Sequence, residues 1–259
     1  MNIEFTKNLG WRTGFRQVLR NECRRWWKSS AWWIHMLLWT VLLNGMTALP
    51  IWRSGMSGGV DPLGYFTLFA GLFPVIAGII TMQNLTIGER LNGTAAWVLS
   101  KPVAPESFVL AKFTGAVLNL SVPMIIVPSI GIGLQLSLAE SASIFSVSYF
   151  GGIGLLLLHF WFYLALTALL GIFATRRAIV IIIPLLFAFI QQYLIQGVPF
   201  LGELFPRFLT MPHSETGQSL SEALMRGREL FSYKPVTSTA VLIVVFAGLA
   251  AERLKHREI

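Results

Sequence analysis

Residues 86–112, TIGERLNGTAAWVLSKPVAPESFVLAK, separate two long apolar stretches of the chain. The segment carries charged residues and helix breakers, and its own apolar run, residues 95–99, is too short to cross a bilayer. The stretches on either side have the length and composition of membrane-spanning helices. We therefore predict that this segment is where a membrane protein meets the aqueous phase.

The composition places the chain among integral membrane proteins. Of its 259 residues, 54% are hydrophobic and 12% are charged, whereas soluble domains carry about 25% charged residues. We predict one all-α transmembrane domain over residues 1–259, without a second, soluble domain. Six spans are expected, at residues 31–51, 64–86, 108–136, 148–173, 178–198 and 235–251.

Several functional classes are disfavoured because the sequence lacks the residues or motifs that they require. One cysteine excludes an internal disulfide, and the four histidines have no metal-ligand spacing. No GxxxxGK[ST] phosphate-binding loop occurs, so the chain is not expected to hydrolyse ATP itself. The predicted spans hold almost no charge, which argues against a proton- or sodium-driven carrier.

The distribution of lysine and arginine predicts the orientation. With the N-terminus inside, fifteen basic residues fall on the cytoplasmic side and five fall outside, as the positive-inside rule requires. Both termini are then cytoplasmic, including the tail at residues 252–259. The segment at residues 86–107 is cytoplasmic, and the long connection at residues 199–234 lies outside.

Residues 1–30 are predicted to form an amphipathic basic helix that lies in the lipid interface. Apolar residues recur at helical spacing, and five basic residues, Arg12, Arg16, Arg20, Arg24 and Lys28, follow one another four apart. The alternative is a solvated basic segment that leads into the first span.

The outer connection, residues 199–234, has two interpretations. Its apolar first part could enter the outer leaflet as a re-entrant piece, or the whole could be a folded loop that covers helix ends. Ser219 and Glu222 have the spacing of a capping box, which predicts a short helix after Ser219.

The opening segment has its own local signals. Thr86 and Glu89 have capping-box spacing, which predicts that a helix begins there, and Asn92 and Gly93 break the chain.

A short apolar helix is expected next, over residues 95–100, with Thr94 as its cap and Trp97 as its largest side chain. Pro102 stops this helix, and Pro105 suits the first turn of the following one. A capped apolar helix between two spans is suited to insertion into the groove of a partner protein.

At these residues the chain resembles the permeases of type-2 ABC exporters. Their E-R-x-x-G-T-x-x-x-x-L-S-x-P-V signature lies between the second and third of six spans, and the whole chain is similar to them in topology. Members often place an acidic residue after Gly-Thr, where this chain has Ala96 and Trp97. The signature is matched by Glu89, Arg90, Gly93, Thr94, Leu99, Ser100, Pro102 and Val103.

The resemblance implies that the segment is a coupling helix seated on a separate cytoplasmic ATPase. Two permease chains, identical or different, and two ATPase chains would form an exporter in a prokaryotic inner membrane. This chain would hold no cofactor, because ATP and Mg²⁺ would bind the ATPase, and no nucleic acid is expected. The coupling residues would be Glu89, Arg90, Gly93, Thr94, Trp97, Leu99 and Pro102.

In this family the second and fifth spans line the transport pathway. The polar residues of those spans could contact the substrate, or they could form hydrogen bonds between helices. They are Gln83, Asn84, Gln191, Gln192, Tyr193 and Gln196.

Two other functions are open at this point. The chain could be a membrane scaffold that transmits force or assists assembly in an ABC-type complex without transporting anything. It could also be a membrane-embedded enzyme, for which His159 would be the candidate, although a packed histidine is the simpler interpretation. The few charges in the spans favour a hydrophobic or amphipathic cargo.

Overall fold

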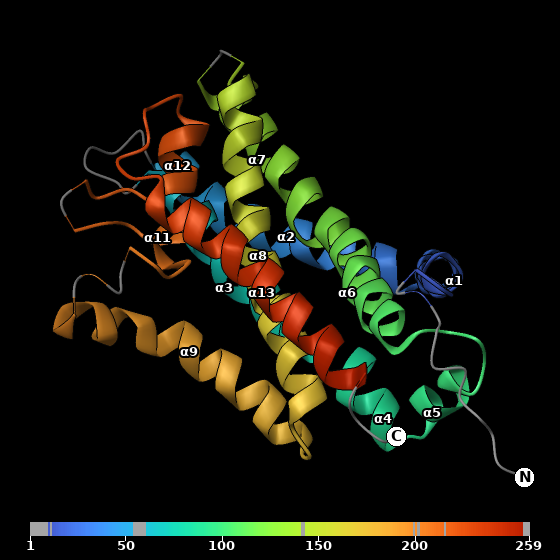
Figure 1. The fold of residues 1–259 in the computed structure, drawn as a ribbon. Coiled ribbons are helices and arrows are strands. Elements are labelled where there is room, and N and C mark those ends of the chain that lie inside the picture. The colour runs from blue at the N-terminus through green and yellow to red at the C-terminus, as the bar shows by residue number, and fades with distance from the viewer. Residues whose placement is uncertain are drawn as a thin grey trace, which may run out of the picture.

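The computed structural model describes residues 10, 12–53, 61–140, 143–198, 200, 203–214 and 216–255. These residues are helical with short connections, and no strand occurs among them, so the predicted all-α class is confirmed (Figure 1). The α-helices are α1 (Phe15–Lys28), α2 (Ala31–Arg53), α3 (Pro62–Gln83), α4 (Glu89–Leu91), α5 (Thr94–Leu99), α6 (Pro105–Ser121), α7 (Val127–Ala139), α8 (Val147–Phe173), α9 (Arg177–Gly197), α11 (Arg207–Thr210), α12 (Leu220–Met225) and α13 (Lys234–Lys255).

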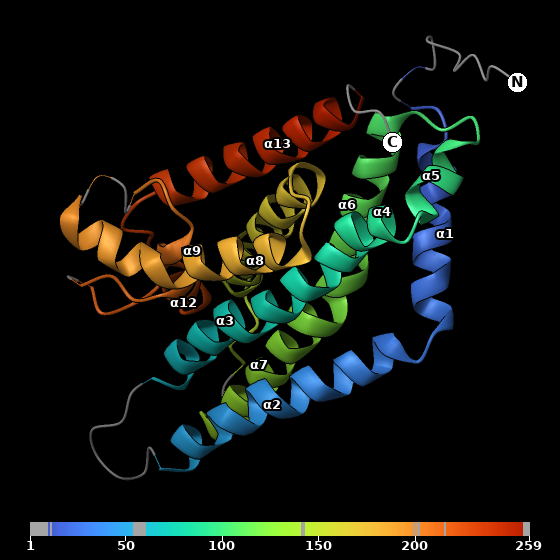
Figure 2. The same ribbon diagram turned by 90° about the horizontal axis from the view of Figure 1, so that it is seen from below.

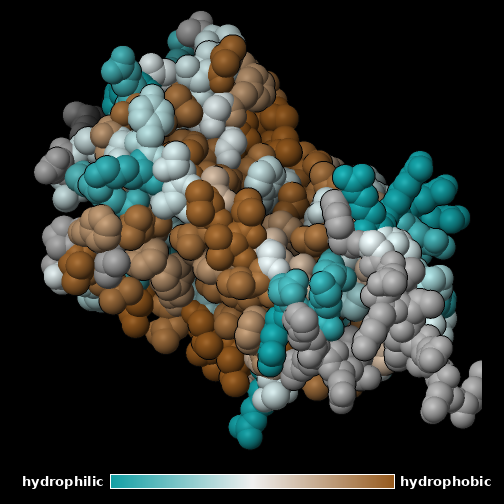
Figure 3. Space-filling model, in the orientation of Figure 1, coloured by the Kyte–Doolittle hydropathy of each residue, from teal (hydrophilic) through white to brown (hydrophobic). Residues whose placement is uncertain are grey.

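Five helical segments in the described part of the chain are long and apolar enough to cross a membrane. They are Ala31–Leu49, Pro62–Leu91, Pro105–Ala139, Val147–Phe173 and Lys234–Lys255. A sixth apolar stretch, Arg177–Gln191 in α9, is shorter than this criterion. Figure 3 shows apolar surface across the middle of the molecule, with polar side chains gathered towards its two ends.

The second apolar segment corrects the prediction at Thr86. α3 continues through a π-helical turn, Asn84–Gly88, into α4, so no new helix begins at Thr86. The Thr86 hydroxyl donates to the carbonyl of Met82 instead of capping a helix end, and the side chain is buried against Gly171 of α8. The capping-box spacing was misleading because tertiary packing makes the longer helix favourable.

The third apolar segment is also longer than predicted. α6 and α7 join through a second π-helical turn, Val122–Ile126, and the joined helix runs from Pro105 to Ala139. Pro123 lies inside this turn. A proline cannot donate the regular helical hydrogen bond, and a π-turn absorbs that defect without ending the helix. Pro105 occupies the first turn of α6, as predicted.

α8 is the centre of the bundle, packed against α3, α6, α9, α12 and α13 (Figure 2). Its sequence is apolar on all sides, as expected for a surrounded helix. Its close approach to α3 depends on Gly78, because a Cβ there would lie 2.5 Å from the ring of Phe160.

α1 and α9 lie at the edges of the bundle. α1 packs along α6, with Val18 buried between them. α9 contacts α3 and α8 but leaves an apolar stripe uncovered, which includes Ile182, Leu186 and Phe189.

The end of the bundle that carries α11 and α12 is closed by the connection before α13. Ser219 caps α12, and its hydroxyl accepts the Glu222 amide at 3.2 Å, as predicted. Leu209 and Leu220 are buried against Leu155 of α8. We call this the α12 end, and the opposite end, with α4 and α5, the α5 end.

Candidate functional site

α5 is held against the bundle by one face. Gly93 adopts a left-handed conformation (φ 73°) that favours glycine, and this turn lets the chain reverse after α4. Thr94 is the first residue of α5 and not its cap, which is Gly93. Ala95 and Leu99, one helical turn apart, are buried in an apolar cluster contributed by α6, α8 and α13. The other buried members of this cluster are Phe108, Val109, Ile172, Ala250 and Leu254.

The other face of α5 presents an aromatic side chain. Trp97 is 62% exposed, and the Nζ atom of Lys101 lies 3.6 Å from the centroid of its ring. Thr94 and Ala96 are exposed beside it. A large, rigid aromatic group on a firmly packed helix has the properties of an interface anchor.

A charge cluster, formed by Glu22, Arg25, Glu89 and Lys112, joins three helices beside α5. The Nζ atom of buried Lys112 lies 2.6 Å from Glu22 of α1 and 2.6 Å from Glu89 of α4. Arg25 adds an ion pair with Glu22 at 2.8 Å from a more exposed position. The cluster therefore fixes α1, α4 and α6 to one another.

Arg90 binds the end of α8. Its Nη1 atom donates to the carbonyl oxygens of Gly171 at 2.7 Å and of Ile172 at 2.8 Å. The last carbonyls of a helix lack partners within the helix and carry partial negative charge, which suits a guanidinium group. Glu89 and Arg90 thus make contacts within the chain, whereas Thr94 and Trp97 project from its surface.

The remaining predicted coupling residues lie between these two groups. Leu99 faces the apolar cluster, and Gly93 and Pro102 are exposed in the turns before and after α5. Glu22 and Lys112 were not among the predicted site residues. Glu22 is unusual in the sequence because it is the one acidic residue of α1, but its partner Lys112 lies 90 positions away.

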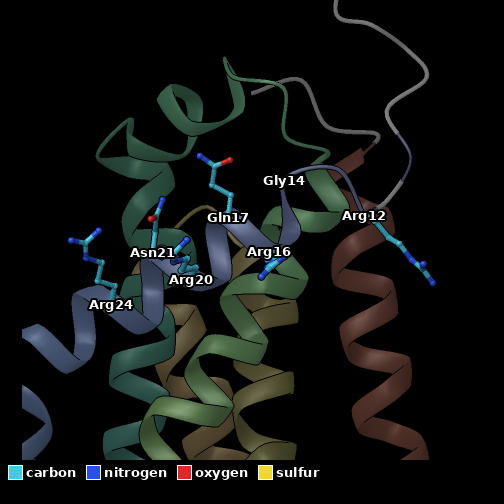
Figure 4. Close-up of a pocket in the computed structure, with 7 residues that line it drawn as sticks. All are labelled: Arg12, Gly14, Arg16, Gln17, Arg20, Asn21 and Arg24. Carbon is cyan, nitrogen blue, oxygen red and sulfur yellow. The ribbon is translucent and has the colours of Figure 1, made fainter.

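The basic face of α1 lies near α5. The backbone amide of Ala104 donates to the carbonyl of Thr13 at 3.1 Å, which ties the start of α1 to the chain that follows α5. A shallow surface hollow of about 700 Å³ runs along the exposed face of α1 (Figure 4). It is lined by Arg12, Gly14, Arg16, Gln17, Arg20, Asn21 and Arg24.

The predicted pathway residues lie on α3, on the π-helical turn that follows it and on α9, and α9 contacts both of these elements. Gln83 and Asn84 lie where α3 ends, and the Gln83 amide donates to Asn84 at 2.6 Å. Gln191 lies on α9, and its amide donates to the hydroxyl of Tyr163 of α8 at 2.6 Å.

Their exposure differs as well. Gln83 and Gln191 are buried, and each has an amide oxygen without a hydrogen-bond partner in the described structure. Asn84 and Tyr193 are exposed. The side chains of Gln192 and Gln196 lie outside the described residues.

His159 is packed among backbone groups. Its Nδ1 atom lies 3.0 Å from the carbonyl oxygen of Pro206, and its Nε2 atom lies 3.0 Å from that of Gly71. No group of three or more metal-ligating side chains occurs in the parts of the chain that the structure describes. The ring joins α3, α8 and the chain before α11, which is a packing role.

Comparison with known proteins adds no assignment. No protein-family model matches the chain, and a search of curated proteins found no significant match.

Proposed function

We propose that this chain is the membrane-spanning permease subunit of an ABC exporter, coupled through α5 to a separate cytoplasmic ATPase. The observation that carries the proposal is the two-sided packing of α5. Ala95 and Leu99 fix one face to three long helices, while Trp97 on the other face is exposed and available to a partner. The signature residues between the second and third apolar segments support the same function.

Coupling requires that motion at α5 reach the spans. The apolar cluster joins α5 to α6, α8 and α13, and the charge cluster joins α4 to α1 and α6. An ATPase that binds ATP and Mg²⁺ and then closes would bias the bundle between two states through these contacts. Two ATPase chains and two permease chains complete the transporter, and the apolar stripe of α9 can meet lipid or the second permease.

The proposed topology has six spans, with α9 as the fifth. α9 has 21 residues, which corresponds to about 31 Å of helix and is enough to cross the hydrocarbon core. The α5 end and both termini face the cytoplasm of a prokaryotic cell, and the chain resides in its inner membrane. The basic face of α1 lies against lipid headgroups, and the outer connection closes the opposite end.

Purification of the complex tests the proposal. The chain should co-purify with an ATPase in equal amounts, and Trp97→Ala should weaken that association and the ATPase activity of the complex. Trp33→Ala is the matched control, because Trp33 is also exposed, at 46%, but lies on α2. Failure to recover an ATPase, or equal behaviour of the two variants, would contradict the proposal.

Force transmission without transport is the second candidate. It is favoured by one observation, the burial of Gln83 and Gln191, whose amides each donate to a side chain of the same chain. It retains the contact between α5 and the ATPase but needs no pathway. Reconstituted vesicles separate the two functions, since only an exporter moves a hydrophobic or amphipathic cargo across the bilayer when ATP is supplied.

A further inference from the structure

The surface hollow of about 700 Å³ along α1 is lined mainly by hydrogen-bond donors. Arg16, Arg20 and Arg24 follow one another four positions apart and so share one side of the helix. Gln17 and Asn21 form the neighbouring row, and Figure 4 shows their amide groups projecting from the helix. No acidic residue is among the described residues that line the hollow. Its chemistry therefore matches an anion that can accept several hydrogen bonds.

The arginines of this row are not used by the rest of the chain. Arg16, Arg20 and Arg24 are exposed, and they make no ion pair or hydrogen bond with the residues that the structure describes. The one acidic residue of α1, Glu22, binds Lys112 of α6 on another face of the helix. The three guanidinium groups are therefore available to an anion from outside the chain.

The row lies on a helix that is held in place. Val18 is buried where α1 packs along α6, and Glu22 pairs with Lys112 at 2.6 Å. The Ala104 amide fixes the start of α1 by donating to the Thr13 carbonyl at 3.1 Å. Positions four apart on a helix are separated by about 6 Å along its axis, so two neighbouring guanidinium groups can reach one phosphate. Arginine suits this task because its planar fork of donors matches phosphate oxygens.

The end of α1 lies where a bilayer has its headgroups. α1 ends at Lys28, and α2, the first of the long apolar segments, begins at Ala31. Trp27 and Trp33 are exposed on either side of this junction, and exposed tryptophans are typical of the membrane interface. Arg24 lies one helical turn before Lys28. The anions nearest to the arginine row are therefore lipid phosphates.

We propose that the hollow of α1 is a saturable site for the headgroup of an anionic phospholipid, with Arg16, Arg20 and Arg24 on its phosphate oxygens. Gln17 and Asn21 add neutral donors beside the phosphate. A zwitterionic headgroup would bring its own cation towards the arginines, so the site favours lipids with a net negative charge. The proposal rests on the proposed function only in placing the site in the cytoplasmic leaflet.

Calorimetric titration of the full chain tests the site. The protein is delipidated in a neutral maltoside detergent and titrated with dioctanoyl phosphatidylglycerol. Dioctanoyl phosphatidylcholine, which has the same acyl chains and no net charge, is the control lipid. Saturable binding of phosphatidylglycerol is expected, at least tenfold tighter than any binding of phosphatidylcholine. Absence of phosphatidylglycerol binding, or equal affinity for the two lipids, would overturn the proposal.

Two double variants that remove equal charge locate the site. Arg16→Gln with Arg20→Gln should weaken binding at least tenfold, while the melting temperature changes little because both side chains are exposed. Arg253→Gln with Lys255→Gln removes two charges from the exposed end of α13 and should bind as the wild type does. Equal affinities of the two double variants would show that net charge alone governs the interaction, which contradicts a site on α1.

Further titrations distinguish the lipid from other anions. Inorganic phosphate should bind much more weakly than phosphatidylglycerol, because acyl chains hold a lipid headgroup at the level where α1 ends. Equal affinity for inorganic phosphate would make the ligand a soluble anion and overturn the assignment to lipid. An acidic protein surface is the remaining occupant. It would replace the lipid if Arg16→Gln with Arg20→Gln reduced recovery of the ATPase and left lipid binding unchanged.

The lipid titration is independent of the exporter function. It uses the permease chain without an ATPase and measures no transport. A negative lipid titration would leave the test with Trp97→Ala as it stands, and failure to recover an ATPase would leave a measured lipid site in place.

Discussion

At the scale of single residues, Lys112 of α6 joins α1 and α4 at the α5 end, although α1 and α6 are far apart in the sequence. It is buried, and its ammonium group meets one carboxylate of α1 and another of α4. Such a group is tolerated only while its partners remain, because an unpaired charge in the same place would be very costly.

Replacing this lysine should therefore destabilise the fold. In Lys112→Met, Glu22 and Glu89 lose their buried counter-ion, and we expect a loss of about 3–5 kcal/mol, measured as a large fall in the melting temperature of the detergent-solubilised protein. Arg25→Ala is the control, since this side chain is 61% exposed and should contribute at most about 1 kcal/mol. Similar melting temperatures for the two variants would show that the cluster does not hold the helices together.

Gly171 tests the contact between α8 and the π-turn that contains Thr86. A Cβ at Gly171 would collide with the Thr86 side chain, so Gly171→Ala should destabilise the protein by about 1–3 kcal/mol. Gly154→Ala lies on the same helix with nothing within 4 Å of the added atom, and it should be neutral or slightly stabilising. Thermal unfolding of both variants measures this difference, and equal melting temperatures would contradict the close packing of Gly171 against Thr86.

At the scale of elements, α5 has six residues, too few to be stable as a helix by itself. Its stability must come from the buried face, and the same face transmits any force that a partner applies. Substitutions in the buried face should therefore raise the rate at which α5 opens locally, whereas substitutions on the exposed face should not.

Hydrogen exchange can measure this dependence. Leu99→Ala removes the largest buried side chain of α5, so the amides of residues 96–101 should exchange faster while those of α8 keep their protection. Ala96→Ser alters the exposed face and should leave exchange nearly unchanged. If Leu99→Ala leaves the exchange of these amides as it is, the apolar cluster does not hold α5.

At the scale of the whole molecule, the distribution of charge predicts which end faces the cytoplasm. The α5 end and α12 end should then react differently with a thiol reagent that cannot cross membranes. Cys23 is first replaced by serine, because it is the only cysteine of the chain. In intact cells Arg228→Cys should be labelled, whereas Ala96→Cys should be labelled only after permeabilisation. The reverse pattern would invert the proposed topology.

Much of the fold could be predicted from the sequence because membrane helices are recognised by a local property. Runs of apolar residues located the five long segments, and Ser219 and Pro105 marked helix starts correctly. Thr86 was misread because the same spacing occurs inside a longer helix, where packing against Gly171 decides the outcome.

The candidate site could be predicted in part. Trp97 stood out in the sequence, but the pairing of Glu89 with Lys112 and the contact of Arg90 with α8 did not.

The sequence by itself determined the all-helical class, the apolar segments and the short α5 with its tryptophan, since these depend on residues close together in the chain. Only the tertiary structure decided that Lys112 meets Glu22, that Arg90 binds the end of α8, and that Glu222 is buried beside the start of α3. The physical reason is distance along the chain. Hydrophobic runs and caps act over a few residues, whereas burial and charge pairing depend on which distant helices the packing brings together.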